Sequence, residues 1–298
     1  VTDALQGITG YKGTVSVTVD ANTTLAQLKT ITNSTVNKAK FGTTTAATTL
    51  EGTAKEITAV LNKFSTQYDG KLTVTGKYTL AELRDLDKAL GASTGVVTLD
   101  NDVNLSGKSA DIAAALSNVT GYAGKITLTD KPTLGDLIAI NAATAEAIKI
   151  PTDTALTGTA TQILQALNGV EGHKGNITVS GTPAAADVNT IAGLTTGVVR
   201  ATIATGAVKA TLDAIAKVDA NDIITFVTND TSVDASDLVA LKVKVDTLDT
   251  ASVTTITETA ANIGTSAATI KAALAIAPNK AVIIDGNISA ADLDSIAN

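Results

Sequence analysis

The feature of this chain that most limits its fold is a motif that returns about every fifty residues. In each copy, a short stretch of alternating apolar and polar residues is followed by a turn and then by an apolar stripe. In repeat proteins each unit packs mainly on its neighbours, and all units share one core. The motif occupies residues 71–83, 125–137, 176–188 and 281–293, with looser copies at 14–28 and 223–238.

The sequence therefore predicts one continuous repeat array over residues 1–298. Because both ends fall inside a repeat, we expect the first and last repeats to be incomplete. We also expect the chain to continue in a longer protein or to associate end to end with another copy. The approximate repeats are 1–52, 53–107, 108–158, 159–206, 207–264 and 265–298.

Each repeat contains the pattern of two strand–helix segments. Apolar residues alternate in the strands, as in Leu72/Val74, which indicates one buried face. Apolar residues three and four positions apart then form helical stripes, as in 57–64 and 80–90. Alternating strands and helices predict an α/β fold with parallel strands. Since a sheet covered on both faces has continuously apolar strands, we expect helices on one face only. A right-handed α/β solenoid fits best, and a doubly wound α/β domain is the alternative.

Composition indicates what the core is made of and which partners are disfavoured. Apolar residues are 44% of the chain but aromatic residues only 2%, so the core must consist of Ala, Val, Leu and Ile. The net charge of −7, without a basic cluster, disfavours nucleic-acid binding. No apolar run is long enough to predict a transmembrane segment. The absence of cysteine excludes disulfides, Cys-ligated zinc and thiol chemistry.

Equivalent positions of the repeats should share burial. The positions that we expect in the core are Leu61, Leu116, Leu167 and Leu274 in one column and Leu83, Leu137, Val188 and Leu293 in another.

An acidic or amide residue recurs at the start of the first helix of each repeat. Three residues earlier stands Thr, Ser or Asp, and this spacing is typical of a capping box rather than of a catalytic or metal site. Asp187 also suits a first helical turn, and Pro183 suits a helix entry. The predicted cap pairs are Thr24/Gln27, Thr79/Glu82, Thr133/Asp136, Asp234/Asp237 and Ser289/Asp292.

The single histidine, His173, would be the obvious general base in an enzyme. Its sequence context GHKG aligns with the contexts of Tyr11, Tyr68 and Tyr122. A column of flat rings beside a turn indicates a structural role, and no nucleophile motif accompanies the histidine. We therefore predict no catalytic residues. The glycines that end these turns, where positive φ is expected, are Gly13, Gly70, Gly124 and Gly175.

Two further features could bind ligands. The oxygen-rich segments with Asp100 and Asp102, and with Asp230, are weak calcium candidates, because both lack the spacing of known calcium loops. A solvated turn is the simpler interpretation, and no other cofactor is expected. The polar positions of the strands form a Thr-rich face that could bind a glycan or an ordered surface, although Thr also suits any exposed strand. These positions include Thr14/Ser16/Thr18, Lys71/Thr73/Thr75 and Lys125/Thr127/Thr129.

The stretches ITVSGT, AAADVNTIAGLTTGVV, GTATQILQAL and ISAADLDSIAN resemble repeats of very large secreted surface proteins of marine cyanobacteria, including motility-associated and hemolysin-like proteins. The likeness covers nearly the whole chain. It implies export, a location at the cell surface or in a filament, and a structural rather than enzymatic role. The calcium-binding nonapeptides of some such proteins are absent here. The leading hypothesis is thus an extracellular structural repeat protein, and the alternative is a surface- or glycan-binding module.

Overall fold

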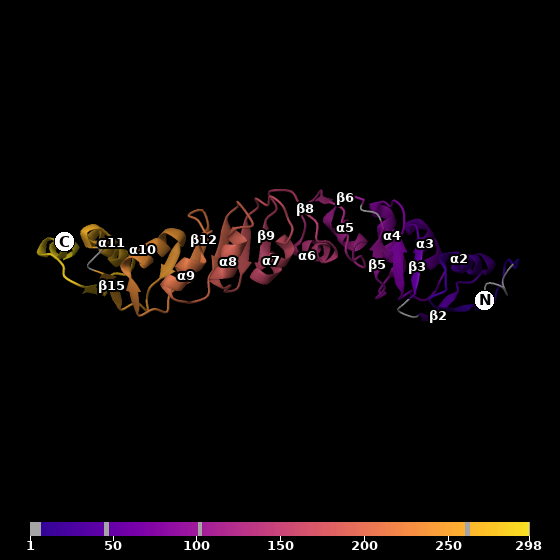
Figure 1. The fold of residues 1–298 in the computed structure, drawn as a ribbon, viewed down its shortest axis with the longest axis horizontal. Coiled ribbons are helices and arrows are strands. Elements are labelled where there is room, and N and C mark those ends of the chain that lie inside the picture. The colour runs from indigo at the N-terminus through magenta and orange to yellow at the C-terminus, as the bar shows by residue number, and fades with distance from the viewer. Residues whose placement is uncertain (1–6, 45–47, 101–102, 260–262, 298) are drawn as a thin grey trace. The chain divides into compact units, whose positions relative to one another are not determined.

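The computed structural model of the chain describes residues 7–44, 48–100, 103–259 and 263–297. Strands and helices alternate along these residues, so the protein is of the α/β class, as predicted (Figure 1). The helices are α2 (Leu25–Ser34), α3 (Ala54–Leu61), α4 (Leu80–Leu90), α5 (Ser109–Ala115), α6 (Leu134–Ala143), α7 (Ala160–Leu167), α8 (Ala185–Ala192), α9 (Val208–Ala214), α10 (Ala235–Lys244), α11 (Ile263–Ile276) and α12 (Ala290–Ala297).

The strands are short, and every strand pair in the described residues is parallel. They are β1 (Ser16–Val19), β2 (Lys40–Thr44), β3 (Thr49–Gly52), β4 (Lys71–Val74), β5 (Val97–Leu99), β6 (Leu105–Gly107), β7 (Ile126–Leu128), β8 (Ile148–Lys149), β9 (Leu156–Thr159), β10 (Ile177–Ser180), β11 (Val199–Thr202), β12 (Ile223–Val227), β13 (Ser232–Asp234), β14 (Thr247–Asp249), β15 (Thr255–Thr259) and β16 (Ala281–Asp285).

The chain divides into two compact units. The N-terminal unit comprises Val1–Pro151 with Gln165–Glu171, and the C-terminal unit comprises Thr152–Leu164 with Gly172–Asn298. The described residues of the N-terminal unit form three parallel sheets, ordered β1-β2, β3-β4-β5 and β6-β7-β8. Its helices α2 to α6 pack on one another in sequence order. Each element therefore contacts mainly its neighbours along the chain.

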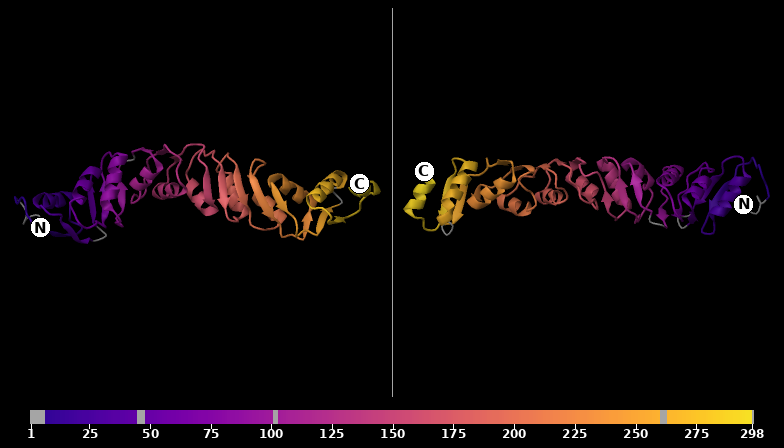
Figure 2. Two further views of the ribbon diagram at one scale, coloured as in Figure 1. Left: turned by 180° about the vertical axis from the view of Figure 1, so that it is seen from behind. Right: turned by 90° about the horizontal axis from the view of Figure 1, so that it is seen from above.

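In the C-terminal unit, too, each element contacts mainly its neighbours along the chain, and the described residues form two sheets. One sheet has the order β14-β12-β11-β10-β9, and the other has β13-β15-β16. Figure 2 shows strands β9 to β12 side by side, and their register places Ile177 between Leu156 and Val199. Helices α8 to α12 pack consecutively. The connection between neighbouring parallel strands contains a helix, as parallel pairing requires.

Burial alternates along the strands in the way the sequence predicts. In β10, Ile177 and Val179 are buried while Thr178 and Ser180 are exposed. The same alternation occurs in β1, β7 and β11. One face of these strands therefore belongs to the apolar core under the helices, and the other face is polar and open. None of the helices within the described ranges is long and apolar enough to cross a lipid bilayer.

The predicted core columns are confirmed at six positions and fail near the C-terminus. Leu61, Leu116 and Leu167 are buried, as are Leu83, Leu137 and Val188. Leu274, in contrast, is only half-buried, and Leu293 is 54% exposed. In α11, Ile270 and Ala273 are buried, and Ala277 just after the helix is buried as well. Leu274 therefore lies one position away from the buried stripe of its helix. Leu293 is exposed because, within the described residues, α11 is the helix that packs on α12 and nothing comparable covers its other side.

Candidate functional site

The residues that would suggest an acidic site in the sequence instead lie at helix N-termini. At α4, the Glu82 N–H donates to Thr79 Oγ1 over 3.2 Å, and the Thr79 N–H donates to the Glu82 carboxylate over 2.9 Å. The same reciprocal pair begins α2 and α6. These capping boxes satisfy backbone donors that have no partner inside the helix. The predicted capping role is therefore confirmed at these three helices.

Two predicted caps differ in detail. At α10, Asp234 accepts hydrogen bonds from the N–H groups of Ser236 and Asp237, without the return bond of a full box. At α12, the Asp292 N–H donates to Ser289 Oγ over 3.1 Å. Helix α8 begins after Ala184, which makes no side-chain cap, and Pro183 precedes that position. Asp187 lies in the first turn of α8, where a negative charge is favourable.

Two capping boxes were missed by the sequence analysis. Thr53 and Glu56 begin α3, and Thr159 and Gln162 make the same reciprocal bonds at the start of α7. The hydrogen bond from the Thr53 backbone is the main cause that lowers the pKa of Glu56. The signal was in the sequence, because TAKE and TATQ have the required spacing of three residues.

Helices α5 and α9 are capped by a residue from a different segment. Their own N-cap residues, Lys108 and Ala207, make no side-chain cap. The Ser109 N–H donates to the Asp130 carboxylate over 2.8 Å, and the Val208 N–H donates to Asp230 over 2.7 Å. Asp130 and Asp230 follow strands β7 and β12, which come after these helices in the chain. Each aspartate thus fastens its own strand to the preceding helix.

This contact gives the weak calcium candidates a different interpretation. Asp230 Oδ2 accepts a second hydrogen bond from Thr228 Oγ1 over 3.2 Å, so it works as a cap. Asp100 is exposed, and its N–H donates to the Val74 carbonyl over 3.0 Å. Asp102 lies outside the described residues. Within those residues, no three His, Cys, Asp or Glu side chains are grouped so that they could hold a metal ion.

Helix C-termini also receive donors from neighbouring segments. Lys244 Nζ donates to the carbonyls of Ile215, Ala216 and Val218 at distances of 3.2, 3.1 and 2.7 Å, just after the end of α9. Asn141 Nδ2 donates to the Ala166 carbonyl in α7 over 2.7 Å. The last carbonyls of a helix have no partner within it, and donors from another segment, cationic ones such as Lys244 included, are favourable at that end.

Side chains that precede the strands connect neighbouring strands of one sheet in a similar way. Asn176 Oδ1 accepts from the Val198 N–H over 3.0 Å, and Asp222 accepts from the Val199 N–H over 2.8 Å. Asp246 accepts from the Ile224 N–H over 3.1 Å. The residue just before one strand therefore holds the start of the adjacent strand.

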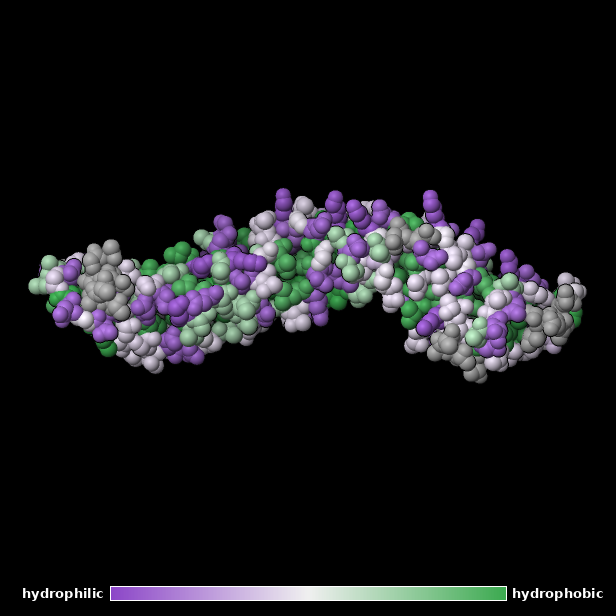
Figure 3. All heavy atoms as spheres, viewed as in Figure 1, coloured by the Kyte–Doolittle hydropathy of each residue, from purple (hydrophilic) through white to green (hydrophobic). Residues whose placement is uncertain are grey.

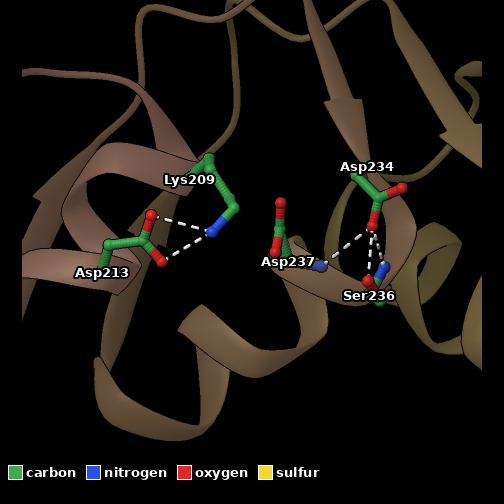
Figure 4. A network of polar contacts seen from close by, with 5 residues as sticks. All are labelled: Lys209, Asp213, Asp234, Ser236 and Asp237. Carbon is green, nitrogen blue, oxygen red and sulfur yellow. Dashed lines mark hydrogen bonds and ion pairs between the residues drawn. The ribbon is translucent and has the colours of Figure 1, made fainter. Parts of the chain in front are cut away.

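A network of polar side chains in the C-terminal unit lies on α9 and at the start of α10 (Figure 4). Lys209 Nζ forms an ion pair with Asp213 at 2.6 Å, one turn along α9. The hydrogen bond to Asp213 raises the pKa of Lys209. Across from this pair, burial raises the pKa of Asp237, and the charge of Asp234 acts in the same direction. Every member of the network is on a helix surface or at a helix cap, which explains its arrangement without a ligand.

The ring column predicted from Tyr11, Tyr68, Tyr122 and His173 is buried at its last three positions. Tyr68 donates its hydroxyl to the Thr48 carbonyl over 3.3 Å, and Tyr122 donates to the Val103 carbonyl. Burial raises the pKa of Tyr68 to about 12. Each hydroxyl therefore reaches the chain just before a neighbouring strand, and the rings connect successive segments.

The glycines beside these rings were predicted to have positive φ, and that prediction is wrong. Gly13, Gly70, Gly124 and Gly175 are not among the residues with positive φ. Their role is to leave space, because a Cβ at Gly70 would lie 2.5 Å from Cζ of Tyr68. A Cβ at Gly175 would likewise lie 2.9 Å from Cε1 of His173. The ring of each Tyr-x-Gly or His-x-Gly sequence folds over the glycine two residues later.

The open strand face carries rows of threonine. In the C-terminal unit, Thr202, Thr225 and Thr247 lie beside one another on β11, β12 and β14, and Thr157 lies beside Thr178. Figure 3 shows hydrophilic and hydrophobic residues interspersed over the face turned to the viewer. At the edge where these strands begin, a polar groove of about 360 Å³ is lined by Asn176, Thr195, Thr196, Gly197, Lys217, Asp219, Asn221 and Asp222, among others.

Comparison with known proteins assigns no role to any of these residues. No protein-family model, no curated protein and no solved structure matches the chain.

Proposed function

We propose that this chain is a structural repeat region of an extracellular protein, such as a surface-layer, filament or adhesin stalk component, and that it catalyses no reaction. One observation carries the proposal: polar side chains at helix and strand ends bind the neighbouring segment. Asp130, Asp230, Lys244 and Asn141 all bridge segments that are separated in sequence. Such bonds serve cohesion between segments, which is what a structural array needs.

The proposal includes the arrangement of the segments. Parallel strands paired with their neighbours, and helices packed in sequence order, are expected for an α/β solenoid with helices on one side. In such an array each added segment repeats the same interface, so length can grow without a new core. The doubly wound alternative requires helices on both faces of the sheet. The exposed Thr178 and Ser180 on the open face of β10 favour the solenoid.

The proposed location and partners rest on the resemblance to secreted surface repeats. The partner would be the continuation of a longer chain or a second copy added head to tail, and no nucleic acid is expected. A heterologous contact of that kind extends into a filament unless its rotation closes a ring. The acidic loops are weak calcium candidates, so the proposed function includes no role for calcium.

Two measurements test the proposal. Antibodies raised against the chain should label the outside of intact source cells, in a continuous layer or along filaments, when viewed by electron microscopy. Labelling confined to the cell interior would contradict an extracellular role. Analytical ultracentrifugation of the 298-residue chain at micromolar concentration should show concentration-dependent association. A monomer at every concentration would rule out self-association, although not continuation in a longer chain.

A second candidate function is binding of a glycan or another ordered surface. The observation that favours it is the combination of in-register threonines with the polar groove at the same sheet. Hydroxyl and amide groups on a rigid sheet suit the hydroxyls of a polysaccharide. Co-sedimentation with insoluble polysaccharides would test it, using Thr178→Lys on the open face and Thr161→Lys on α7 as the matched control. Loss of binding in the first variant alone would support this function, and absence of binding by the unmodified chain would reject it.

A further inference from the structure

His173 differs from the other buried rings of its column in how its polar atoms are satisfied. The side chain is 3% exposed, and within the described residues neither Nδ1 nor Nε2 has a hydrogen-bond partner. Tyr68 and Tyr122 each donate a hydroxyl to a carbonyl of a neighbouring segment. An imidazole is shorter than a phenol and lacks that hydroxyl. His173 therefore fills the same place through packing alone.

The surroundings of His173 suit only the neutral ring. Its backbone lies between two neighbours, since the Lys174 N–H donates to the Thr152 carbonyl over 3.0 Å and the Thr196 N–H donates to the His173 carbonyl over 3.3 Å. A protonated imidazole has two N–H donors and a charge, and a buried charge without a partner is costly. Charged residues close to His173 in the chain are Glu171 and Lys174, and Asp153 follows Thr152 on the paired segment; all three are exposed.

Electrostatics agrees with this geometry. Burial lowers the pKa of His173 below its ordinary value of 6.5, and it is the only cause of the shift. A protonated imidazole is stabilised mainly by hydration. The charged ring of His173 is therefore more stable in solvent than in its buried position.

We propose that His173 is an acid-sensitive latch: the neutral ring holds the segments of β9, β10 and β11 together, and its protonation expels the ring and opens these segments locally. The bonds that would open are those that join the ring's loop to its neighbours, namely Lys174 to Thr152 and Thr196 to His173. His173 stands where the equivalent positions have tyrosine, so the loop that contains it would respond to acid.

The sign of the effect follows from linkage. Above pH 6.5 the ring is neutral in both the folded and the unfolded chain and contributes no pH dependence. As the pH falls through 6.5, the unfolded chain binds a proton that the folded chain excludes, so stability falls. For each pH unit between the unfolded and folded pKa values, the unfolding equilibrium constant should rise by up to about tenfold. At a pH below the folded pKa, the effect is complete.

Because His173 is the only histidine of the chain, NMR reads its ionisation directly. We would follow the imidazole Hε1 signal from pH 8 to pH 4 and measure amide hydrogen exchange over residues 152–203 at both ends of that range. The expected result is a midpoint below 6.5, together with lower protection factors of the Lys174 and Thr196 amides at low pH, each rate being compared with that of an unstructured amide at the same pH. A midpoint at or above 6.5, or protection factors of these amides that do not change, would overturn the proposal.

Two variants separate the latch from general acid effects. His173→Tyr restores the ring found in the other copies, and His173→Phe supplies a ring that cannot ionise. When the pH is lowered from 7.5 to 5, the urea concentration at the unfolding midpoint should fall less in both variants than in the unmodified chain. Equal losses in all three proteins would refute the latch. If either variant does not fold, the NMR titration of the unmodified chain still decides the question.

Discussion

The role of the glycines beside the rings, which is to leave space for them, can be tested with one substitution and a matched control. Gly124→Ala would place a methyl group 2.7 Å from Cζ of Tyr122 and 2.7 Å from the Val103 carbonyl oxygen. Real Cβ contacts are longer than this, so the ring or the neighbouring chain must move. Gly135→Ala is the control, because the only atom near a Cβ there is Thr133 Oγ1 at 3.8 Å. Gly135 lies in the first turn of α6.

The two substitutions should change stability in opposite directions. Overpacking at Gly124 costs about 1–3 kcal/mol, and displacing the Tyr122 hydroxyl from the Val103 carbonyl adds roughly 1 kcal/mol. The total destabilisation is therefore about 2–4 kcal/mol. At Gly135, alanine reduces the entropy of the unfolded chain without a clash and should stabilise by about 0.4–1 kcal/mol.

Urea unfolding followed by far-UV circular dichroism measures both changes. The midpoint of Gly124→Ala should fall and that of Gly135→Ala should rise relative to the unmodified chain. If Gly124→Ala unfolds at the midpoint of the unmodified chain or above it, the Tyr122 ring does not need the space that Gly124 leaves. A fall in both midpoints would mean that alanine is poorly tolerated in this region for another reason.

Three other predictions concern caps and core, and each is measured by the same urea unfolding. Thr79→Ala removes the capping box of α4 and should cost about 0.5–2 kcal/mol; no change would show that Glu82 alone suffices. Asp130→Ala removes the cap that reaches α5 from a later segment and should cost a similar amount, whereas the exposed Asp100→Ala should stay within about 0.5 kcal/mol. Leu137→Ala should cost about 2–5 kcal/mol, while the same change at the exposed Leu293 should cost less than about 1 kcal/mol; equal costs would contradict the burial of the repeat columns.

Helix starts and strand faces could be predicted well from the sequence. A capping box joins residues three positions apart, so Thr79 and Glu82 contain the whole signal within one turn. Alternation in β10 likewise depends only on which residues follow one another. Both kinds of information are local, and the missed box at Thr53 and Glu56 shows the same pattern. The aligned contexts of His173 and the tyrosines also placed the rings in one column.

Contacts between segments were decided only by the tertiary structure. The caps from Asp130 and Asp230 join residues 21 and 22 positions apart, and no local pattern connects them. Strands β5 and β6 are close in sequence yet belong to different sheets, because β5 pairs with β4 and β6 pairs with β7. Likewise, Leu293 has the same sequence pattern as Leu137 yet is exposed, because α11 is the one helix that packs closely on α12 within the part of the chain that the structure describes. Burial depends on what covers a side chain, and in this protein the cover comes from another segment.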